Sequence, residues 1–232
     1  MEIQLRPRGV SQFLVSILVL LTIAHGIAMI ARYYFGFETL KGFVPMFNLS
    51  AEKNFPTLVS TIYLVSCGCL LVIIAAAHKR RGEPFILWAF LGLIFFLLGL
   101  DEFTSIHERV GVILRPENVP VLFSVFWVVP YGLLVLVLGV MYLKFLFRLP
   151  LRFRKLFILS GALYVFGALI LELPFAYLYL EYGAGNIFIA ILSTFEEVFE
   201  ICGVSLFIYS LLSYLAVQFA PFSLGVSEEQ AS

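Results

Sequence analysis

Ionisable residues gather at a few places in a chain that is otherwise strongly apolar. In the stretch from Asp101 to Glu108, two acids arrive directly after a long apolar run, and a His-Glu pair follows them. On a helix with about 100° between successive residues, Asp101, Ser105 and Glu108 share one face. Glu102 and His107 flank that face on opposite sides. Carboxyl and imidazole groups are suited to general acid–base catalysis and to metal binding.

A second acidic cluster lies within another apolar segment and consists of Glu196, Glu197 and Glu200. Glu196, Glu200 and Gly203 follow helical spacing, which predicts one stripe along a helix with Glu197 to one side. A glycine in that stripe would let a neighbouring helix approach closely. Glu172 is a single acid in a further apolar segment.

The elements that position these residues are membrane spans. The chain has 232 residues, is 62% hydrophobic and only 13% charged, and has a mean hydropathy of +1.03. Soluble domains are about half apolar and about a quarter charged, so the solvent for most of this chain is lipid. The apolar runs are continuous rather than alternating, which favours helices over barrel strands. The expected fold class is an all-α bundle of six transmembrane helices, at about 10–31, 57–77, 84–103, 120–146, 156–180 and 186–217.

The distribution of Lys and Arg predicts the topology. Ten of the 15 Lys and Arg residues lie before the first span, between the second and third, or between the fourth and fifth. The positive-inside rule therefore predicts cytoplasmic N- and C-termini. Residues 1–220 are expected to form a single transmembrane domain, followed by a short disordered tail at 221–232. The formal net charge of +0 gives no indication of nucleic-acid binding.

This topology assigns a depth to each intramembrane polar residue at ~1.5 Å per residue. His25 is expected ~9 Å below the outer end of its helix, and Asp101 and Glu102 ~5 Å. Glu172 is expected ~12 Å deep, and the stretch from Glu196 to Glu200 ~15–21 Å. All of them fall in the outer half of the membrane, which is what a shared site requires.

The energetic cost of these acids indicates what such a site must contain. An ionised acid at mid-membrane costs at least ~2.5–3.5 kcal/mol. The last two spans carry no Lys or Arg at this depth, and Arg109 is the only nearby cation. Protons or a bound cation must therefore neutralise the cluster.

A mixed carboxylate and imidazole set suits a divalent metal such as Fe, Mn or Zn. The predicted ligands are Asp101, His107, Glu172, Glu196, Glu197 and Glu200, with His25 as a further candidate. Glu102 and Glu108 are the predicted acid/base groups. The Glu-x-x-His pairs of helical di-iron sites are absent from the sequence, and so are nucleotide-binding motifs.

Each of these residues also has a simpler interpretation. The stretch from Asp101 to Glu108 can be an ordinary charged helix end at the membrane border. The buried glutamates can be protonated and hydrogen-bonded between helices. His25 and the three cysteines can be packing residues, and His78 can be a border residue beside the basic run.

Four motifs resemble a family of uncharacterised polytopic bacterial inner-membrane proteins. They are Phe47-Asn48-Leu49 to Asn54-Phe55-Pro56-Thr57, Leu100-Asp101-Glu102 to His107-Glu108-Arg109, Leu171-Glu172-Leu173, and Phe195-Glu196-Glu197 to Glu200 before Gly203. The resemblance covers nearly the whole chain. It implies a multi-pass protein of the bacterial inner membrane and implies no particular activity.

Three functions remain open at this point. The first is a metal-dependent membrane enzyme whose site opens toward the outer leaflet and acts on a lipid-soluble or small substrate. The second is a proton- or cation-coupled transporter or channel in which the same acids bind the ion. The third is a non-catalytic subunit, partnered with itself or with a larger membrane complex, whose acids hold helices together.

Overall fold

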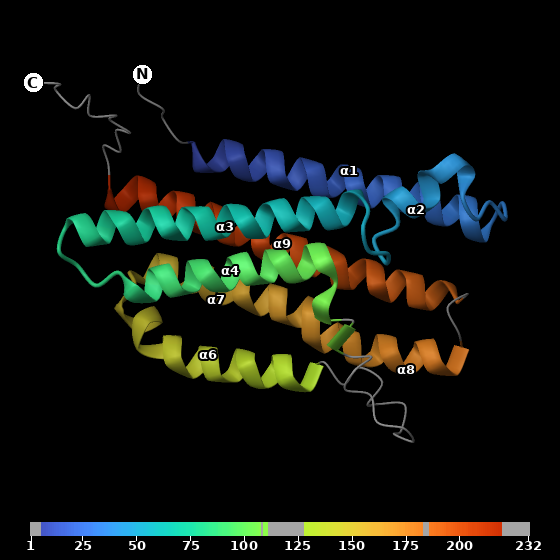
Figure 1. Ribbon diagram of the computed structural model, residues 1–232. Coiled ribbons are helices and arrows are strands. Elements are labelled where there is room, and N and C mark those ends of the chain that lie inside the picture. Colours follow the sequence, from blue (N-terminus) through green and yellow to red (C-terminus); the bar gives the residue numbers. More distant parts are fainter. Residues whose placement is uncertain (1–5, 108, 111–127, 183–185, 220–232) are drawn as a thin grey trace, which may run out of the picture.

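The computed structural model describes residues 6–107, 109–110, 128–182 and 186–219. These residues form long helices that lie side by side, roughly parallel or antiparallel to one another, with no strand among them (Figure 1). The helices are α1 (Pro7–Tyr33), the 3-10 helix η1 (Leu40–Gly42), α2 (Phe43–Phe47), α3 (Phe55–Arg80), α4 (Ile86–Thr104), α6 (Val128–Arg148), α7 (Leu151–Val165), the π-helix η3 (Phe166–Leu171), α8 (Glu172–Tyr182) and α9 (Ile187–Gln218).

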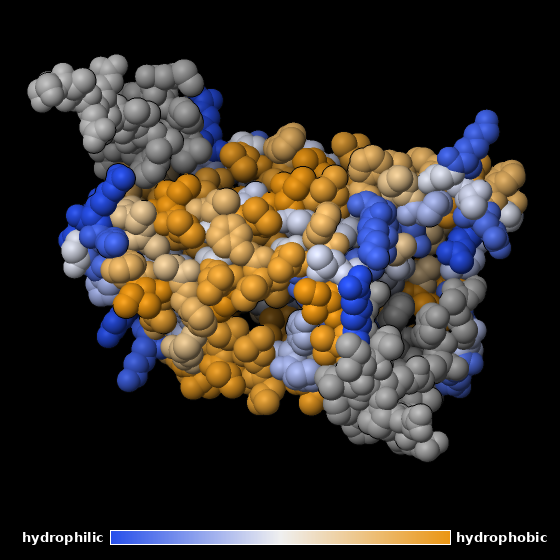
Figure 2. Space-filling model, in the orientation of Figure 1, coloured by the Kyte–Doolittle hydropathy of each residue, from blue (hydrophilic) through white to orange (hydrophobic). Residues whose placement is uncertain are grey.

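Six of the helical segments are long and apolar enough to cross a membrane, which confirms the predicted number. One of the six, Leu151–Pro174, combines α7, η3 and the start of α8. Apolar side chains cover the middle of the visible face, and hydrophilic residues gather toward its two ends (Figure 2). The predicted tail at 221–232, and the part of the predicted fourth span at 120–127, lie outside the described residues.

Helix α9 is the central element of the bundle. It contacts α1, α3, α7 and η3, and nearly every residue from Ile201 to Leu215 is buried. Helix α6 lies at the periphery, where most of its side chains face outward. A long central helix with neighbours along several of its faces is the expected place for polar groups that must avoid lipid.

Two glycines bring the α7–η3 segment into backbone contact with α9. A Cβ atom on Gly203 would lie 2.7 Å from the backbone nitrogen of Tyr164 and 2.8 Å from the carbonyl oxygen of Ser160. A Cβ atom on Gly167 would lie 2.7 Å from the carbonyl oxygen of Glu196. The predicted close approach of a neighbouring helix at Gly203 is confirmed, and it occurs one turn from Glu200.

The π-helix η3 ends immediately before Glu172. Pro174 has no N–H, and its ring would collide with the carbonyl group of Ile170 in a regular α-helix. A wider π turn over Phe166–Leu171 relieves that collision, and such turns are frequent at functional sites. The local sequence therefore changes the direction in which Glu172 leaves the helix, compared with a regular α-helix.

Helix α4 ends at Thr104, which corrects the prediction that Asp101, Ser105 and Glu108 share one helical face. Ser105 adopts the left-handed conformation with φ 53° and caps the helix through its N–H, which donates to the carbonyl oxygen of Asp101. The chain then turns, and the N–H of His107 donates to Oδ1 of Asp101 at 2.9 Å. This local hydrogen bond competes with helix continuation. Glu108 itself lies outside the described residues.

The first residue of α1 and the last residue of α9 lie at the same end of the bundle, which also holds the α3–α4 and α6–α7 connections (Figure 1). We call it the basic end because Lys79, Arg80 and Arg148 lie there. His78, expected only as a border residue, is packed into this end. Its ring stacks on Trp88 at 5.5 Å between centroids, and its nitrogens lie 2.5 Å from Glu83 and 3.0 Å from the Tyr214 hydroxyl group.

The contact at Gly203 gives a first testable prediction. Gly203→Ala should lower the free energy of unfolding by about 1–3 kcal/mol, because its methyl group would meet the backbone of Tyr164 and Ser160. The matched control is Gly161→Ala on α7, where a Cβ atom meets nothing within 4 Å. Thermal unfolding of the two purified variants in the same detergent measures the difference. Equal unfolding midpoints would show that the two helices are not in backbone contact.

Candidate functional site

The loop between α2 and α3 is held in shape by the side chain of Asn54. Its Nδ2 group donates to the carbonyl oxygens of Asn48 and Ala51, each at 2.6 Å. Its Oδ1 atom accepts from the backbone N–H of Thr57 at 3.1 Å and so caps the N-terminus of α3. One buried amide therefore closes the loop and starts the next helix.

His25 on α1 attaches the same loop to the central helix. Its Nδ1 atom accepts a hydrogen bond from the N–H of Leu49 at 3.0 Å. Its Nε2 atom lies 2.8 Å from Oγ1 of Thr194, and that hydroxyl group donates to the carbonyl oxygen of Ala190. The ring is therefore neutral with its proton on Nε2. Both nitrogens are engaged, which is the arrangement of a polar packing residue, and metal coordination by His25 would break one of these bonds.

The loop carries Glu52 to the C-terminal end of α4, where His107 lies between two carboxylates. Its Nδ1 atom lies 3.2 Å from Oδ2 of Asp101, and its Nε2 atom 3.9 Å from Oε1 of Glu52. Ser105 donates to Glu52 at 3.1 Å, and the Tyr131 hydroxyl group of α6 donates to Asp101 at 3.3 Å. We call Glu52, Asp101 and His107 the outer group of the site.

A deeper group of carboxylates faces the outer group from inside the bundle. Glu197 interacts electrostatically with Glu102, Glu52 and Glu172, and Glu200 interacts with Glu197, Glu102, Glu196 and Glu172. Each of these side chains is partly or fully shielded from solvent. We call Glu102, Glu172, Glu196, Glu197 and Glu200 the inner carboxylates.

Glu172 and Glu196 form a pair within the inner carboxylates. Their side chains are joined by a hydrogen bond, which requires a proton on one of the two. In the part of the chain that the structure describes, no Lys or Arg forms an ion pair with Glu102, Glu196, Glu197 or Glu200. Neutralisation of these acids by protons or by a bound cation therefore stays a prediction of the sequence.

The described side chains are arranged as pairs rather than as a closed coordination shell. Across residues 6–107, 109–110, 128–182 and 186–219, no three or more His, Cys, Asp or Glu side chains are placed to hold a metal ion. The ligand chemistry of the site, many carboxylates and one imidazole, still suits Fe, Mn or Zn. A metal would have to draw these pairs together. The predicted acid/base role of Glu108 falls on a residue outside those ranges.

Electrostatics at the outer group favour the charged form of His107. Burial alone would lower the pKa of His107, but the hydrogen bond from its ring to Asp101 and the negative charges of Asp101, Glu52 and Glu102 outweigh burial. The pKa of His107 is therefore raised above its usual value of 6.5. The neighbouring acids therefore favour the protonated form of His107.

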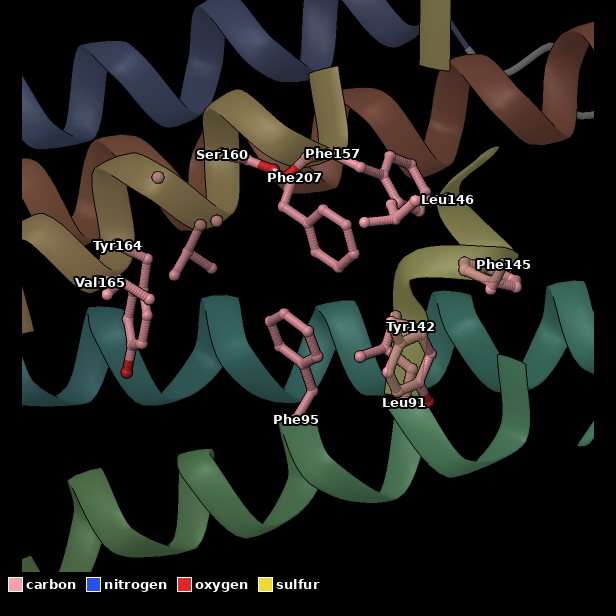
Figure 3. Close-up of a pocket in the computed structure, with 13 residues that line it drawn as sticks. Leu91, Phe95, Tyr142, Phe145, Leu146, Phe157, Ser160, Tyr164, Val165 and Phe207 are labelled. Carbon is pink, nitrogen blue, oxygen red and sulfur yellow. Dashed lines mark hydrogen bonds between the residues drawn. The ribbon is translucent and has the colours of Figure 1, made fainter. Parts of the chain in front are cut away.

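An apolar cavity of about 190 Å³ lies beside α9, where Gly203, three residues after Glu200, lines it. It lies between α4, α6, α7 and α9, and aromatic rings from several helices line it (Figure 3). Tyr164 lies at one end of the cavity, and Phe145 lies toward the other (Figure 3). Tyr164 also interacts electrostatically with Glu200 and Glu102. Tyr164 therefore lines the cavity and lies within electrostatic range of the carboxylates.

The six apolar spans and the enclosed carboxylates define an integral, multi-pass membrane protein. A family model described as a domain of unknown function, DUF8692, matches residues 13–215. The chain belongs to this family. Comparisons with curated proteins and with solved structures give no match.

Most of the residues singled out from the sequence lie together in the structure. They are Asp101, Glu102, His107, Glu172, Glu196, Glu197 and Glu200. His25 contacts α9 two residues before Glu196, and its two ring nitrogens bond to Thr194 and Leu49 rather than to the carboxylates. Sequence reasoning missed Glu52, Tyr131 and Tyr164. Only Glu52 carried a signal, because it lies inside the loop motif between Asn48 and Asn54.

The raised pKa of His107 gives a second prediction. A histidine with a raised folded-state pKa contributes stability that is full below about 6.5 and is lost as the pH rises through the folded-state value. NMR titration of metal-free protein should find the His107 pKa above 6.5 in the wild type. Asp101→Asn should lower it, because the main charge and hydrogen-bond partner is removed.

Glu52→Gln is the comparison variant for this titration and should have a smaller effect. Glu52 acts on His107 through its charge, and its carboxylate lies farther from the ring than that of Asp101. Glu52→Gln should therefore lower the pKa of His107 by less than Asp101→Asn does. An unchanged His107 pKa in Asp101→Asn would contradict the described contact.

Proposed function

We propose that this protein is a metal-dependent membrane enzyme that acts on a lipid-soluble substrate. The carrying observation is that the apolar cavity, lined by Tyr164 and Gly203, lies about one helical turn from Glu200 along α9. A reactive centre that borders an apolar cavity within the bundle is suited to a substrate that arrives from the bilayer. The carboxylates serve as metal ligands and as acid/base groups, and the cavity takes the apolar part of the substrate.

The metal is proposed because Glu102, Glu196, Glu197 and Glu200 need a counter-charge, and no Lys or Arg of the described residues forms an ion pair with them. Glu172, Glu196 and Glu200 are the proposed core ligands, with Asp101, Glu197 and His107 within the same assembly. Metal uptake would displace the proton shared by Glu172 and Glu196, so binding should release protons. Glu102 is the proposed acid/base group, because it faces both the outer group and the inner carboxylates.

Ion transport across the bundle is less well supported, because the path from the site to the basic end is apolar. Beyond Glu200, α9 buries Val204, Phe207 and Leu211 in sequence. Phe207 stacks on Phe95 with 4.9 Å between ring centroids and meets Phe157 edge to face, also at 4.9 Å. No carboxylate or imidazole group of the described residues lies between Glu200 and His78 at the basic end. A charged species would meet an apolar barrier there.

Metal analysis of purified protein tests the proposal. Wild-type protein loaded with Fe, Mn or Zn and then passed over a desalting column should retain stoichiometric metal. Glu196→Gln combined with Glu200→Gln should retain little, because two core ligands become amides of the same shape. Glu83→Gln is the matched control, since Glu83 contacts His78 at the basic end and should leave the metal content unchanged.

The same preparations, placed in liposomes made from bacterial lipid extract, separate the alternatives. Covalent change of a lipid by the wild type and not by the double variant supports the enzyme. A pH-dependent ion flux with no bound metal would establish transport instead. A metal-free wild type that shows neither signal and co-purifies with another protein would identify a subunit of a complex.

A further inference from the structure

We infer that the apolar cavity holds the hydrocarbon chain of a single-chain lipid whose small uncharged polar group, such as an alcohol, lies at the inner carboxylates. This assignment rests on the proposed function, because it names the substrate class of the same site. It is argued from the size of the cavity, its position along the helices, its access, and the charge of its neighbours.

The size and lining of the cavity fit part of a hydrocarbon chain. An apolar cavity of ~150 Å³ in a protein core stays dry and binds a molecule the size of benzene. The cavity of about 190 Å³ is slightly larger, and its walls include Phe95, Phe157 and Phe207. It accommodates a chain segment and is too small for a complete lipid with a bulky head group.

The cavity and the carboxylates follow each other along α9. At ~1.5 Å per residue, Gly203 lies ~4.5 Å and Phe207 ~10.5 Å beyond Glu200 toward the basic end. Both residues line the cavity. A chain in the cavity would therefore point toward the basic end, with its polar group one helical turn away at Glu200.

Access to the cavity is from the lipid side of the bundle. Gly161 lines the cavity, is exposed, and would place a Cβ atom in open space. The peripheral helix α6 supplies the remaining wall through Tyr142, Phe145 and Leu146. A ligand can thus enter from the bilayer without passing through water.

The charge of the site indicates whether the lipid head group is anionic or uncharged. Glu200 lies one helical turn before Gly203 of the cavity wall on α9, and within the described chain no Lys or Arg forms an ion pair with Glu197 or Glu200. A phosphate or carboxylate head group would add a further buried anion to a site whose acids already require protons or a bound cation, which is costly within the bilayer. A hydroxyl group can accept or donate hydrogen bonds to them at no such cost.

Photocrosslinking in proteoliposomes tests this assignment with two probes that share one chain. The first is hexadecanol with a diazirine in the chain, and the second is hexadecanoic acid with the diazirine at the same position. The alcohol should label cavity residues such as Leu146, Phe157 and Phe207. The acid should label them about tenfold less at neutral pH, the effect of a binding difference of ~1.4 kcal/mol.

Filling the cavity should remove the labelling. Gly161→Phe places a ring in the open space and should lower labelling by the alcohol about tenfold. Gly139→Phe is the matched control, because Gly139 also has open space around it but does not line the cavity. Gly161→Leu serves as a second filling variant if the phenylalanine variant fails to fold. Equal labelling of all lipid-facing helices, or labelling unchanged in both filling variants, would overturn the assignment.

Measuring metal content and alcohol labelling on the same wild-type protein distinguishes failure of this inference from failure of the proposed function. If the wild type holds no metal but the alcohol still labels the cavity and filling variants block it, the chain site stands and the metal proposal fails. If the wild type holds metal but the alcohol does not label the cavity, the metal proposal stands and the chain assignment fails. Stronger labelling by the acid than by the alcohol would overturn the choice of an uncharged head group.

Discussion

The high cost of an isolated carboxylate in hydrocarbon is the constraint on which this structure depends. Each ionised acid at mid-membrane costs at least ~2.5–3.5 kcal/mol, so none of the inner carboxylates can face lipid alone. They instead face one another across α4, α8 and α9, with the Glu172–Glu196 hydrogen bond holding one proton. The helices must converge at this level because their acids have no other polar environment within the bilayer.

Backbone features around the cluster make that convergence possible. Gly167 and Gly203 remove the side chains that would keep α9 away from the α7–η3 segment. The π turn before Glu172 turns the chain where Pro174 prevents a regular helix. On the outer side, Asn54 and His25 fix the loop that delivers Glu52 to His107. These small polar and glycine contacts determine where the larger acidic groups lie.

The spans, the acidic residues and the close approach at Gly203 were all predictable from the sequence, because hydropathy, intramembrane charge and helical spacing are local properties of the chain. The end of α4 at Thr104 was not, since it depends on the left-handed Ser105 and on the Asp101 side chain turning back to His107. The role of Glu52 was not predictable either, because Glu52 reaches His107 only when the loop that carries it folds against α1.

The cavity beside Tyr164 could not be predicted either, because it is a space left between four helices and no single stretch of sequence encodes it. The same limit applies to His25. Its depth was consistent with a ligand, but only its contacts with Leu49 and Thr194 show that both ring nitrogens are already used. Sequence identifies which residues are costly to bury, whereas packing decides which partners they find.

Cysteine crosslinking tests the gathering of acids from separate helices most directly. In a background with Cys67, Cys69 and Cys202 replaced, Glu172→Cys with Glu196→Cys should form a disulfide rapidly in native membranes, because the two side chains are in contact. Glu172→Cys with Phe195→Cys should not, since Phe195 is 55% exposed and faces away from the cluster. Equal crosslinking of both pairs, or none in the first pair, would contradict the existence of a shared carboxylate site.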